Sequence, residues 1–167
     1  ATLSDYKVAA GWLNSGTNRN CRAPLINGGK RTVRIVMERF EKRGNETETQ
    51  LDTGDMEHFQ YLYENTLGKK SILFANARNT VEFTVANLKK IAEERHTKDV
   101  YRVHHGSISA ILREETEKEM KQSEEKIATG ATVTLELGMD IGTLDRVVQM
   151  GAPLSVSGFV QRLGRCG

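Results

Sequence analysis

The chain has 167 residues, of which 38% are hydrophobic and 28% charged, a profile typical of a soluble globular protein with a buried core. Its formal net charge of +2 is too small to indicate nucleic-acid binding by itself, so any basic surface must be local. No apolar run approaches the roughly 20 residues that span a bilayer and no signal peptide is recognisable, so we expect a cytoplasmic protein without a membrane partner.

The N-terminal third contains one helical pattern and one strand pattern. Residues 1–16 predict a loop that leads into a short amphipathic helix. Residues 30–40 alternate apolar and polar side chains, which predicts a half-buried strand. The apolar side chains of that strand are Val33, Ile35 and Met37. Residues 41–55 are almost entirely polar and predict a surface loop.

From about residue 55 onward, helical segments alternate with short apolar runs. The predicted helices cover residues 56–67, 79–95, 109–122 and 155–164. The predicted strands cover residues 71–75, 99–105, 126–132 and 144–150. Strands separated by helices indicate βαβ units, and hence an α/β fold with a mostly parallel sheet and right-handed crossovers.

Polar and glycine residues follow the predicted strands. They are Asn76, Gly106 and Ser107, Thr132 and Thr134, and Gly138 and Asp140, while the last helix carries Gln161, Arg162 and Arg165. Backbone N–H groups, hydroxyls and arginines bind phosphate, and a carboxylate accepts from a ribose hydroxyl. Because ligands gather at the carboxyl ends of parallel strands, we expect one edge of the sheet to face a polyphosphate. Each feature alone is also explained by a turn, a helix cap or a solvated arginine. The pair His104 and His105 is interpreted as one packed and one exposed side chain.

The sequence lacks the elements that hold a nucleoside triphosphate. No G-x-x-x-x-G-K-[ST] loop is present, and residues 27–32 only imitate one. No acidic box for magnesium follows it, and Cys21 and Cys166 have no metal-ligand spacing, which favours reduced thiols. The chain is therefore expected to supply only the far wall of a nucleotide site.

Four segments resemble the second RecA-like domain of superfamily 2 helicases, and within them the large helicase-related (Lhr-like) group. "SILFANARNT" resembles motif IV, "VHHGSISAILREETEKEMK" the HHGS segment, "ATVTLELGMDIGTLDRVVQMGAP" motif V and "FVQRLGRCG" motif VI. The resemblance is strong over residues 71–167 and weak over residues 14–68. "ATLSD" resembles the end of motif III, so we expect residues 1–167 to be one RecA-like C-terminal helicase domain, a three-layer sandwich cut from a longer protein. Residues 1–68 would include an interdomain segment and a peripheral region.

The resemblance implies a role for each candidate residue. The catalytic residues would be Arg165 and Gln161. Arg165 matches the arginine finger, and Gln161 would contact the γ-phosphate or orient the attacking water. Gly138, Asp140 and Arg162 fall in the ATP-binding motifs, with Arg162 bracing motif VI. Asn76, Gly106, Ser107, Thr132 and Thr134 would hold the backbone of a nucleic-acid strand. The implied cofactor is ATP with Mg, whose ligands lie in a first RecA-like domain that the chain does not contain, so the chain alone is expected to be inactive.

One residue departs from the family pattern, and two alternative functions remain open. Gly130 stands where such strands carry a branched apolar residue, and we expect it to loosen its strand. A non-catalytic RecA-like module that binds nucleic acid or protein is the main alternative, although such a module is expected to lose the pair Gln161 and Arg165. A dinucleotide-binding enzyme would need a glycine-rich turn after its first strand, and none is present.

Overall fold

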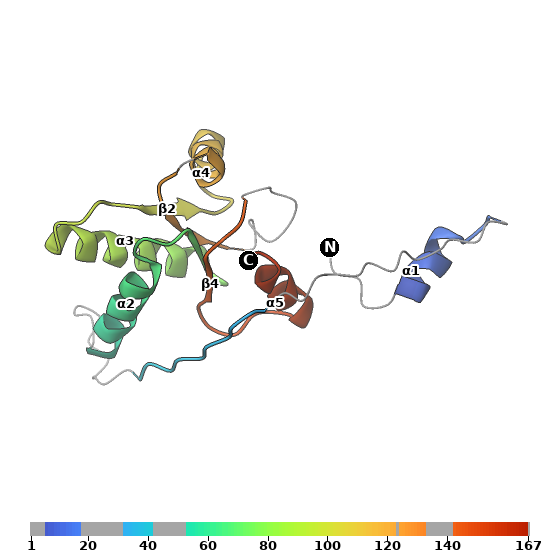
Figure 1. Cartoon of the computed structure of the whole chain (residues 1–167), viewed down its shortest axis with the longest axis horizontal. Coiled ribbons are helices and arrows are strands. Elements are labelled where there is room, and N and C mark those ends of the chain that lie inside the picture. The colour runs from blue at the N-terminus through green and yellow to red at the C-terminus, as the bar shows by residue number, and fades with distance from the viewer. Residues whose placement is uncertain (1–5, 18–31, 42–52, 123, 133–141, 167) are drawn as a thin grey trace.

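The computed structural model describes residues 6–17, 32–41, 53–122, 124–132 and 142–166 (Figure 1). The helices are α1 (Tyr6–Leu13), α2 (Thr53–Thr66), α3 (Arg78–Glu94), α4 (Ala110–Gln122) and α5 (Val156–Leu163). The strands are β1 (Ser71–Phe74), β2 (Tyr101–His104), β3 (Ala128–Ala131) and β4 (Arg146–Gln149). All of the helices and strands predicted after residue 55 are therefore confirmed.

The four strands form one sheet in the order β2-β3-β1-β4, and every pair in it is parallel. Their carboxyl ends lie at one level, because Ala131 is opposite both His104 and Phe74, and Phe74 is opposite Gln149. The loops that leave the four strands therefore start from the same edge of the sheet.

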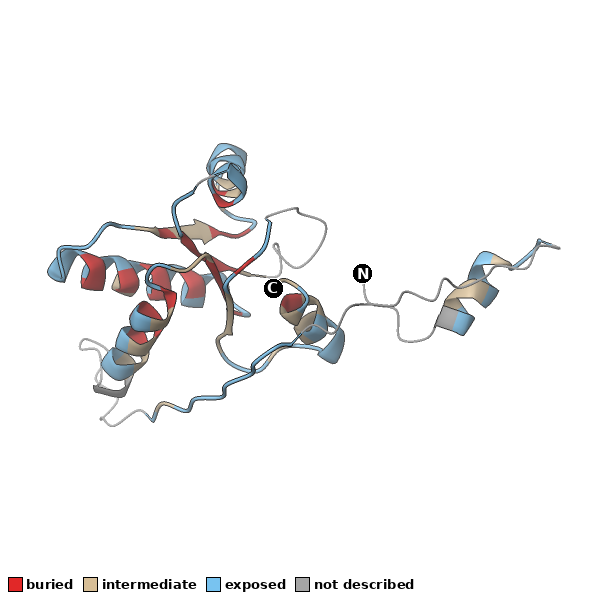
Figure 2. Cartoon of the chain, in the orientation of Figure 1, coloured by how far each residue is buried: buried red, intermediate tan, exposed pale blue. Residues whose placement is uncertain are grey.

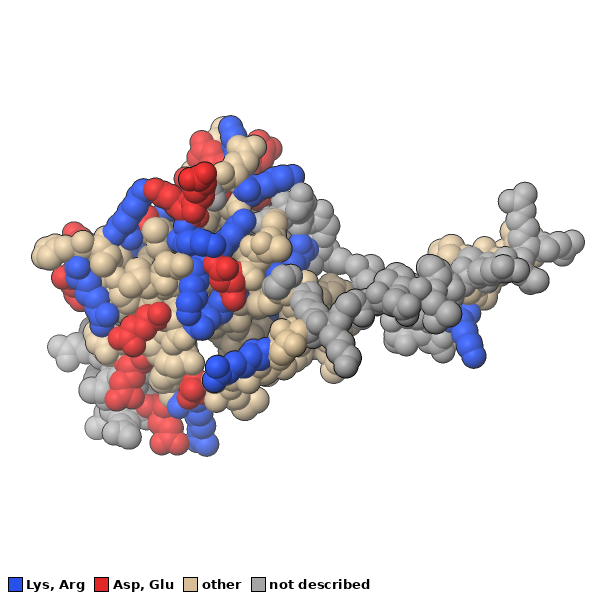
Figure 3. Space-filling view, in the orientation of Figure 1, with Lys and Arg blue, Asp and Glu red and all other residues tan. Residues whose placement is uncertain are grey.

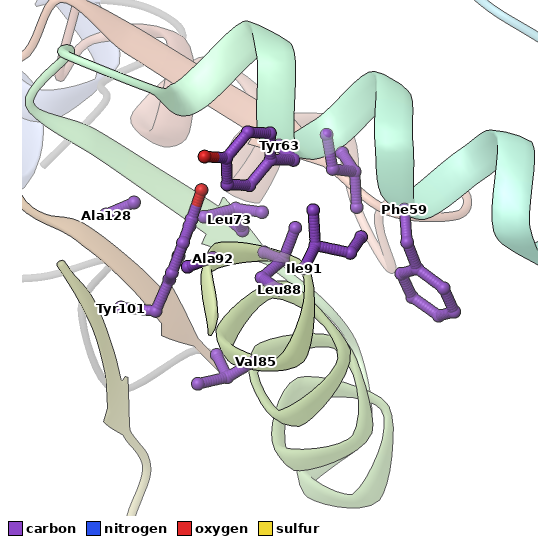
Figure 4. Close-up of a cluster of buried hydrophobic side chains, with 10 residues drawn as sticks. Phe59, Tyr63, Leu73, Val85, Leu88, Ile91, Ala92, Tyr101 and Ala128 are labelled. Carbon is purple, nitrogen blue, oxygen red and sulfur yellow. The ribbon is translucent and has the colours of Figure 1, made fainter. Parts of the chain in front are cut away.

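One face of the sheet is covered by α2 and α3. Leu73 and Tyr101 from the strands pack there against side chains of both helices (Figure 4). The helical members of this cluster are Phe59, Leu62, Tyr63, Val85, Leu88, Ile91 and Ala92. Val85, Leu88 and Ala92 thus form the inner face of α3.

The opposite face is covered by α4 and α5. Ile72 and Phe74 alternate with Leu73 along β1, so their side chains point away from α3. Ile72 and Phe74 join Met120 of α4 in a second buried cluster, and the guanidinium of Arg162 on α5 lies over the Phe74 ring. Buried residues on both sides of β1 explain its uninterrupted apolar sequence, and the three-layer α/β architecture is confirmed (Figure 2).

Gly130 allows α3 to lie close to the sheet. A Cβ atom at this position would lie 2.7 Å from Val85 Cγ2 and 2.9 Å from Val81 Cγ1, closer than real Cβ atoms approach. Gly130 is buried in β3, which pairs with a strand on each side. The expectation that Gly130 loosens its strand is therefore wrong, because the missing side chain makes room for the helix.

The opposite, amino-terminal edge of the sheet is held by Asp145. Its Oδ2 atom accepts hydrogen bonds from the Lys70 backbone N–H at 2.9 Å and from Lys126 Nζ at 3.0 Å. The Lys70 backbone hydrogen bond, and then the Lys126 ammonium group, hold the pKa of the Asp145 carboxyl below its ordinary value. This contact joins the starts of β1 and β4 to the segment before β3.

The predicted strand at residues 30–40 is wrong in the part that the structure describes. Residues 32–41 form no strand, and Ile35 and Met37 are 63% and 93% exposed. The segment is tied to α2 by Phe40, whose ring stacks on His58 at 5.1 Å. Alternation predicts which side of a strand is apolar, but a strand also needs a partner with which to pair. The short helix α1 is confirmed, although Trp12 on its apolar face is 75% exposed.

Candidate functional site

The loop after β1 is fixed to the loop after β4 through Asn76. Asn76 Nδ2 donates a hydrogen bond to the Ala152 carbonyl oxygen at 2.8 Å. Asn76 itself is exposed at the carboxyl edge of the sheet. Asn76 is therefore an exposed side chain whose amide nitrogen already holds it in place.

The loop after β2 contains Gly106 and Ser107, both exposed. The Ser107 backbone N–H donates to His105 Nδ1 at 3.2 Å. Arg78 Nη1, from the start of α3, donates to Ser107 Oγ at 3.0 Å. The loops after β1 and β2 are thus in direct contact.

Thr132 directly follows β3 and is half-buried. The backbone N–H of Ala75 bonds to the Ala131 carbonyl oxygen at 3.0 Å, so the parallel pairing of β1 and β3 continues up to Thr132. Asn76, Gly106, Ser107 and Thr132 therefore lie at the same edge of the sheet, as predicted. Thr134, Gly138 and Asp140 lie outside the described residues.

Among the candidate residues that the structure describes, Arg162 is the most deeply buried, with only 2% of its surface exposed. Its Nη1 atom donates a hydrogen bond to Gln149 Oε1 at the end of β4, and its guanidinium carbon lies 4.8 Å from the centre of the Phe74 ring. Gln149 in turn donates to the Gly151 carbonyl oxygen at 3.1 Å. This geometry supports the bracing role, because the side chain joins α5 to β4 inside the domain. Gln149 and Phe74 were missed by the sequence analysis.

Helix α5 runs back along β4 toward the start of that strand. It begins at Ser155, whose Oγ accepts from the Gly158 backbone N–H at 3.1 Å. At its other end, Cys166 forms a parallel bridge with Leu144, which precedes β4. Arg165, which directly precedes Cys166, therefore lies toward the start of β4 and away from the edge that carries Asn76 and Ser107. Gln161 lies on α5, and both residues are half-buried. The described candidate residues thus fall into two groups, one on and after α5 and one at the carboxyl edge of the sheet.

Both histidines at the end of β2 are buried, so the expectation that one is exposed is wrong. His104 Nε2 lies 2.8 Å from Glu117 Oε1 of α4, and His105 Nε2 lies 2.8 Å from Glu82 Oε1 of α3. Each histidine thus faces a carboxylate on a different side of the sheet. Adjacent residues of a strand point to opposite faces, which is the one signal in the sequence for this arrangement.

The charges that are visible in Figure 3 are mixed, with basic and acidic side chains interspersed over the described surface. Among the described residues, no three His, Cys, Asp or Glu side chains come together in a way that could hold a metal ion. No helix in the described part of the chain is long and apolar enough to cross a membrane.

The all-parallel sheet, the helices on both of its faces and the polar loops at its carboxyl edge define a RecA-like α/β domain. Residues 54–167, more than half of the chain, match the model of the helicase conserved C-terminal domain. The chain belongs to this family of helicase domains.

Several characterised helicases are similar to the chain. It is 40% identical over 99 residues to the ATP-dependent helicase Lhr-Core of Methanothermobacter thermautotrophicus, covering 59% of the chain and 11% of the relative. It is 32% identical over 159 residues to Lhr-Core of Saccharolobus solfataricus, covering 87% of the chain and 18% of the relative. The solved structure of Mycobacterium smegmatis helicase Lhr bound to ssDNA and AMP-PNP matches 70% of the chain and 16% of that protein, with a TM-score of 0.63 and 34% identity.

The comparisons confirm the resemblance to the second RecA-like domain of an Lhr-like superfamily 2 helicase. The chain spans only between 11% and 18% of the length of these two Lhr-Core relatives.

Proposed function

We propose that the chain is the second motor domain of an ATP-dependent nucleic-acid helicase. In this proposal it completes an ATP site formed mainly by a first RecA-like domain, and it holds the backbone of a nucleic-acid strand. The observation that carries the proposal is the separation of two groups of polar residues on one sheet. One group is Gln161 on the braced helix α5 and Arg165 just after it, and the other is Asn76, Gly106, Ser107 and Thr132 at the carboxyl edge.

The first group would serve the ATP side. Arg165 would reach the γ-phosphate across the interdomain cleft, Gln161 would orient the attacking water, and Asp140 would accept from the ribose beside Gly138. Arg162 would hold α5 so that Arg165 is presented at a constant place, and its contacts with Gln149 and Phe74 support this. Phosphoryl transfer depends mainly on positioning and charge stabilisation, so an arginine from a second domain acts only when the cleft is closed.

Magnesium would neutralise phosphate charge when it is bound with ATP. We assign its ligands to the first RecA-like domain, since the described residues bring no suitable cluster together. From this chain, only arginine and glutamine side chains would then contact the phosphates. On this basis the isolated chain would not hydrolyse ATP.

The second group would serve the nucleic-acid side. Asn76, Gly106, Ser107 and Thr132, with Thr134 beyond the described part, offer amide, hydroxyl and backbone groups that suit phosphate oxygens. Contacts to phosphates carry no sequence information, so the domain would hold any strand equally. The Lhr structure bound to ssDNA and AMP-PNP supports both halves of the proposal.

The proposal is tested by Arg165→Ala in the full-length protein. The substitution should reduce nucleic-acid-stimulated kcat by roughly 10³-fold or more while ATP affinity stays nearly unchanged, because the finger acts on charge that develops in the transition state. Arg165→Lys should restore little, since an ammonium group lacks the planar fork of donors. Steady-state ATPase assays and nucleotide-binding titrations measure these effects.

Two further variants make this test specific. Arg162→Ala should lower both the melting temperature and the turnover, because it removes a buried contact between α5 and β4. Arg39→Ala removes an arginine whose side chain is 86% exposed and should change neither. Normal turnover by Arg165→Ala would contradict the role of Arg165 as the finger. Intact nucleic-acid binding without stimulated ATP turnover in the unchanged full-length protein would instead indicate the non-catalytic module.

A further inference from the structure

His105 is a buried side chain that acts as a hydrogen-bond acceptor for the loop that follows it. Its ring is almost fully enclosed between the end of β2 and α3. His105 Nδ1 accepts the hydrogen bond from the backbone N–H of Ser107 at 3.2 Å. The position of Ser107 therefore depends on one lone pair of the histidine ring.

That hydrogen bond defines where the ring proton lies. A neutral imidazole carries one proton, and Nδ1 cannot both accept from Ser107 and hold it, so the proton is on Nε2. Nε2 faces Glu82 Oε1 at 2.8 Å. The carboxylate lies off the direction of the ring N–H, so this contact is electrostatic rather than a well-formed hydrogen bond. Its negative charge favours the proton on Nε2 and leaves Nδ1 free to accept.

The hydroxyl of Ser107 is directed by a second contact. Arg78 Nη1 donates to Ser107 Oγ at 3.0 Å and so occupies one of its lone pairs. A serine hydroxyl has one hydrogen to donate, and no acceptor for it is found among the described residues. Ser107 is exposed, with its backbone N–H already engaged. The group that it offers to a ligand is therefore the hydroxyl hydrogen.

We propose that His105 is a positioning residue that sets the Ser107 hydroxyl to donate to a phosphate oxygen of the bound strand. The inference rests on the proposed function, because it refines one of the backbone contacts assigned there. The ring does not touch the strand in this scheme but acts through Ser107. A hydrogen bond to a charged oxygen is sensitive to small displacements, so losing the acceptor at Nδ1 should weaken binding even though Ser107 is unchanged.

Two substitutions separate the acceptor from the bulk of the ring. In His105→Asn, the amide oxygen can take the place of Nδ1 and accept from Ser107. In His105→Gln, the longer side chain places its amide near the former Nε2, where it meets Glu82 and leaves the Ser107 N–H without an acceptor. Fluorescence anisotropy on the full-length protein, with labelled single-stranded DNA and RNA oligonucleotides, gives the dissociation constants. Thermal melts of the same samples report folding.

We expect His105→Gln to weaken binding about 10-fold, as Ser107→Ala should, and His105→Asn to stay within about 2-fold of the unchanged protein. In the Ser107→Ala background, His105→Gln should have no further effect on binding. Each change removes the same hydrogen bond, the one from the Ser107 hydroxyl to the phosphate. Lys90→Met, which removes a charge from the far end of α3, should leave the affinity unchanged.

Several outcomes would overturn the inference. Equal loss in the Asn and Gln variants, or a further loss from His105→Gln in the Ser107→Ala background, would show that His105 supports the fold in general. Melts in which both variants are unfolded would show the same. In these cases the proposed function stands if the unchanged protein binds both strands and Ser107→Ala weakens binding. Absence of binding by the unchanged protein would remove the proposed function and this inference together.

Discussion

Gly130 shows how a missing side chain can position a helix. The two valines that line α3, Val81 and Val85, occupy the space that a Cβ atom would need. We predict that Gly130→Ala destabilises the protein by about 1–3 kcal/mol, the usual cost of overpacking, because neither branched side chain can move aside freely. Thermal melts should show a decrease of several degrees in the melting temperature.

Gly11 offers a matched control for this change. It lies inside α1, and a Cβ atom there would meet no atom within 4 Å. Gly11→Ala should therefore be neutral or slightly stabilising, since alanine favours helix more than glycine does. Combining Gly130→Ala with Val85→Ala should recover part of the lost stability. An unchanged melting temperature in Gly130→Ala alone would show that α3 is not packed as closely as the structure indicates.

Single residues also mark the limit of sequence-based prediction. Gly130 looked like a weakness because strand preference considers the residue and not the helix above it. One of His104 and His105 was expected to be exposed because a polar residue at a strand end usually is, whereas both are buried against helices on opposite faces of the sheet. Arg162 was expected to brace motif VI. Its partners Gln149 and Phe74 lie on β4 and β1, outside that motif, so they could not be predicted from the residues beside Arg162 in the sequence.

At the scale of elements, Asp145 joins the starts of two strands. Its pKa is lowered from the ordinary value of 3.8, first by the Lys70 backbone N–H and then by Lys126. A lowered pKa means that the charged form stabilises the fold, so the contribution is complete above 3.8 and is lost as the pH falls through the lower, folded-state value. We predict that Asp145→Asn lowers the melting temperature at neutral pH, and that the difference disappears in acid.

Melting curves of both proteins between neutral pH and about pH 3 measure this difference. The effect should be modest and should decrease with added salt, because Asp145 is exposed and its contact with Lys126 is screened. Glu124→Gln, at another exposed acidic position, should show no such pH dependence. A difference that grows on acidification would mean that the carboxylate destabilises the fold.

Helices and strands were predictable from the sequence wherever the pattern of apolar residues can be buried in only one way. β1 is a run of buried residues on both faces, and α3 has one apolar stripe, so each pattern has a single arrangement that buries it. Residues 30–40 alternate equally clearly, but the described part has no strand beside it. The direction of α5 was also missed, since Arg165 was expected at the carboxyl edge and instead lies toward Leu144.

At the scale of the whole molecule, the mixed surface charge limits how strongly a strand can be held. With a net charge of +2 and only a few phosphate contacts, we predict that log K against log salt concentration has a slope on the order of −2 to −4. Thr132→Val should weaken binding equally for oligonucleotides of different sequence, because the contact is to the backbone. Anisotropy titrations at several salt concentrations measure both effects, and a strong preference for one sequence would contradict the backbone assignment.

The two groups of candidate residues are separate in space but share one short chain of contacts. Arg162 donates a hydrogen bond to the side chain of Gln149, and Gln149 donates one to the carbonyl oxygen of Gly151. The next residue, Ala152, accepts the hydrogen bond from Asn76. Three hydrogen bonds thus connect α5 to the side chain proposed to hold the strand. If the proposed function is correct, the turn at residues 149–152 would be the mechanical linkage of the domain, through which a change on the ATP side moves the residues that hold the strand.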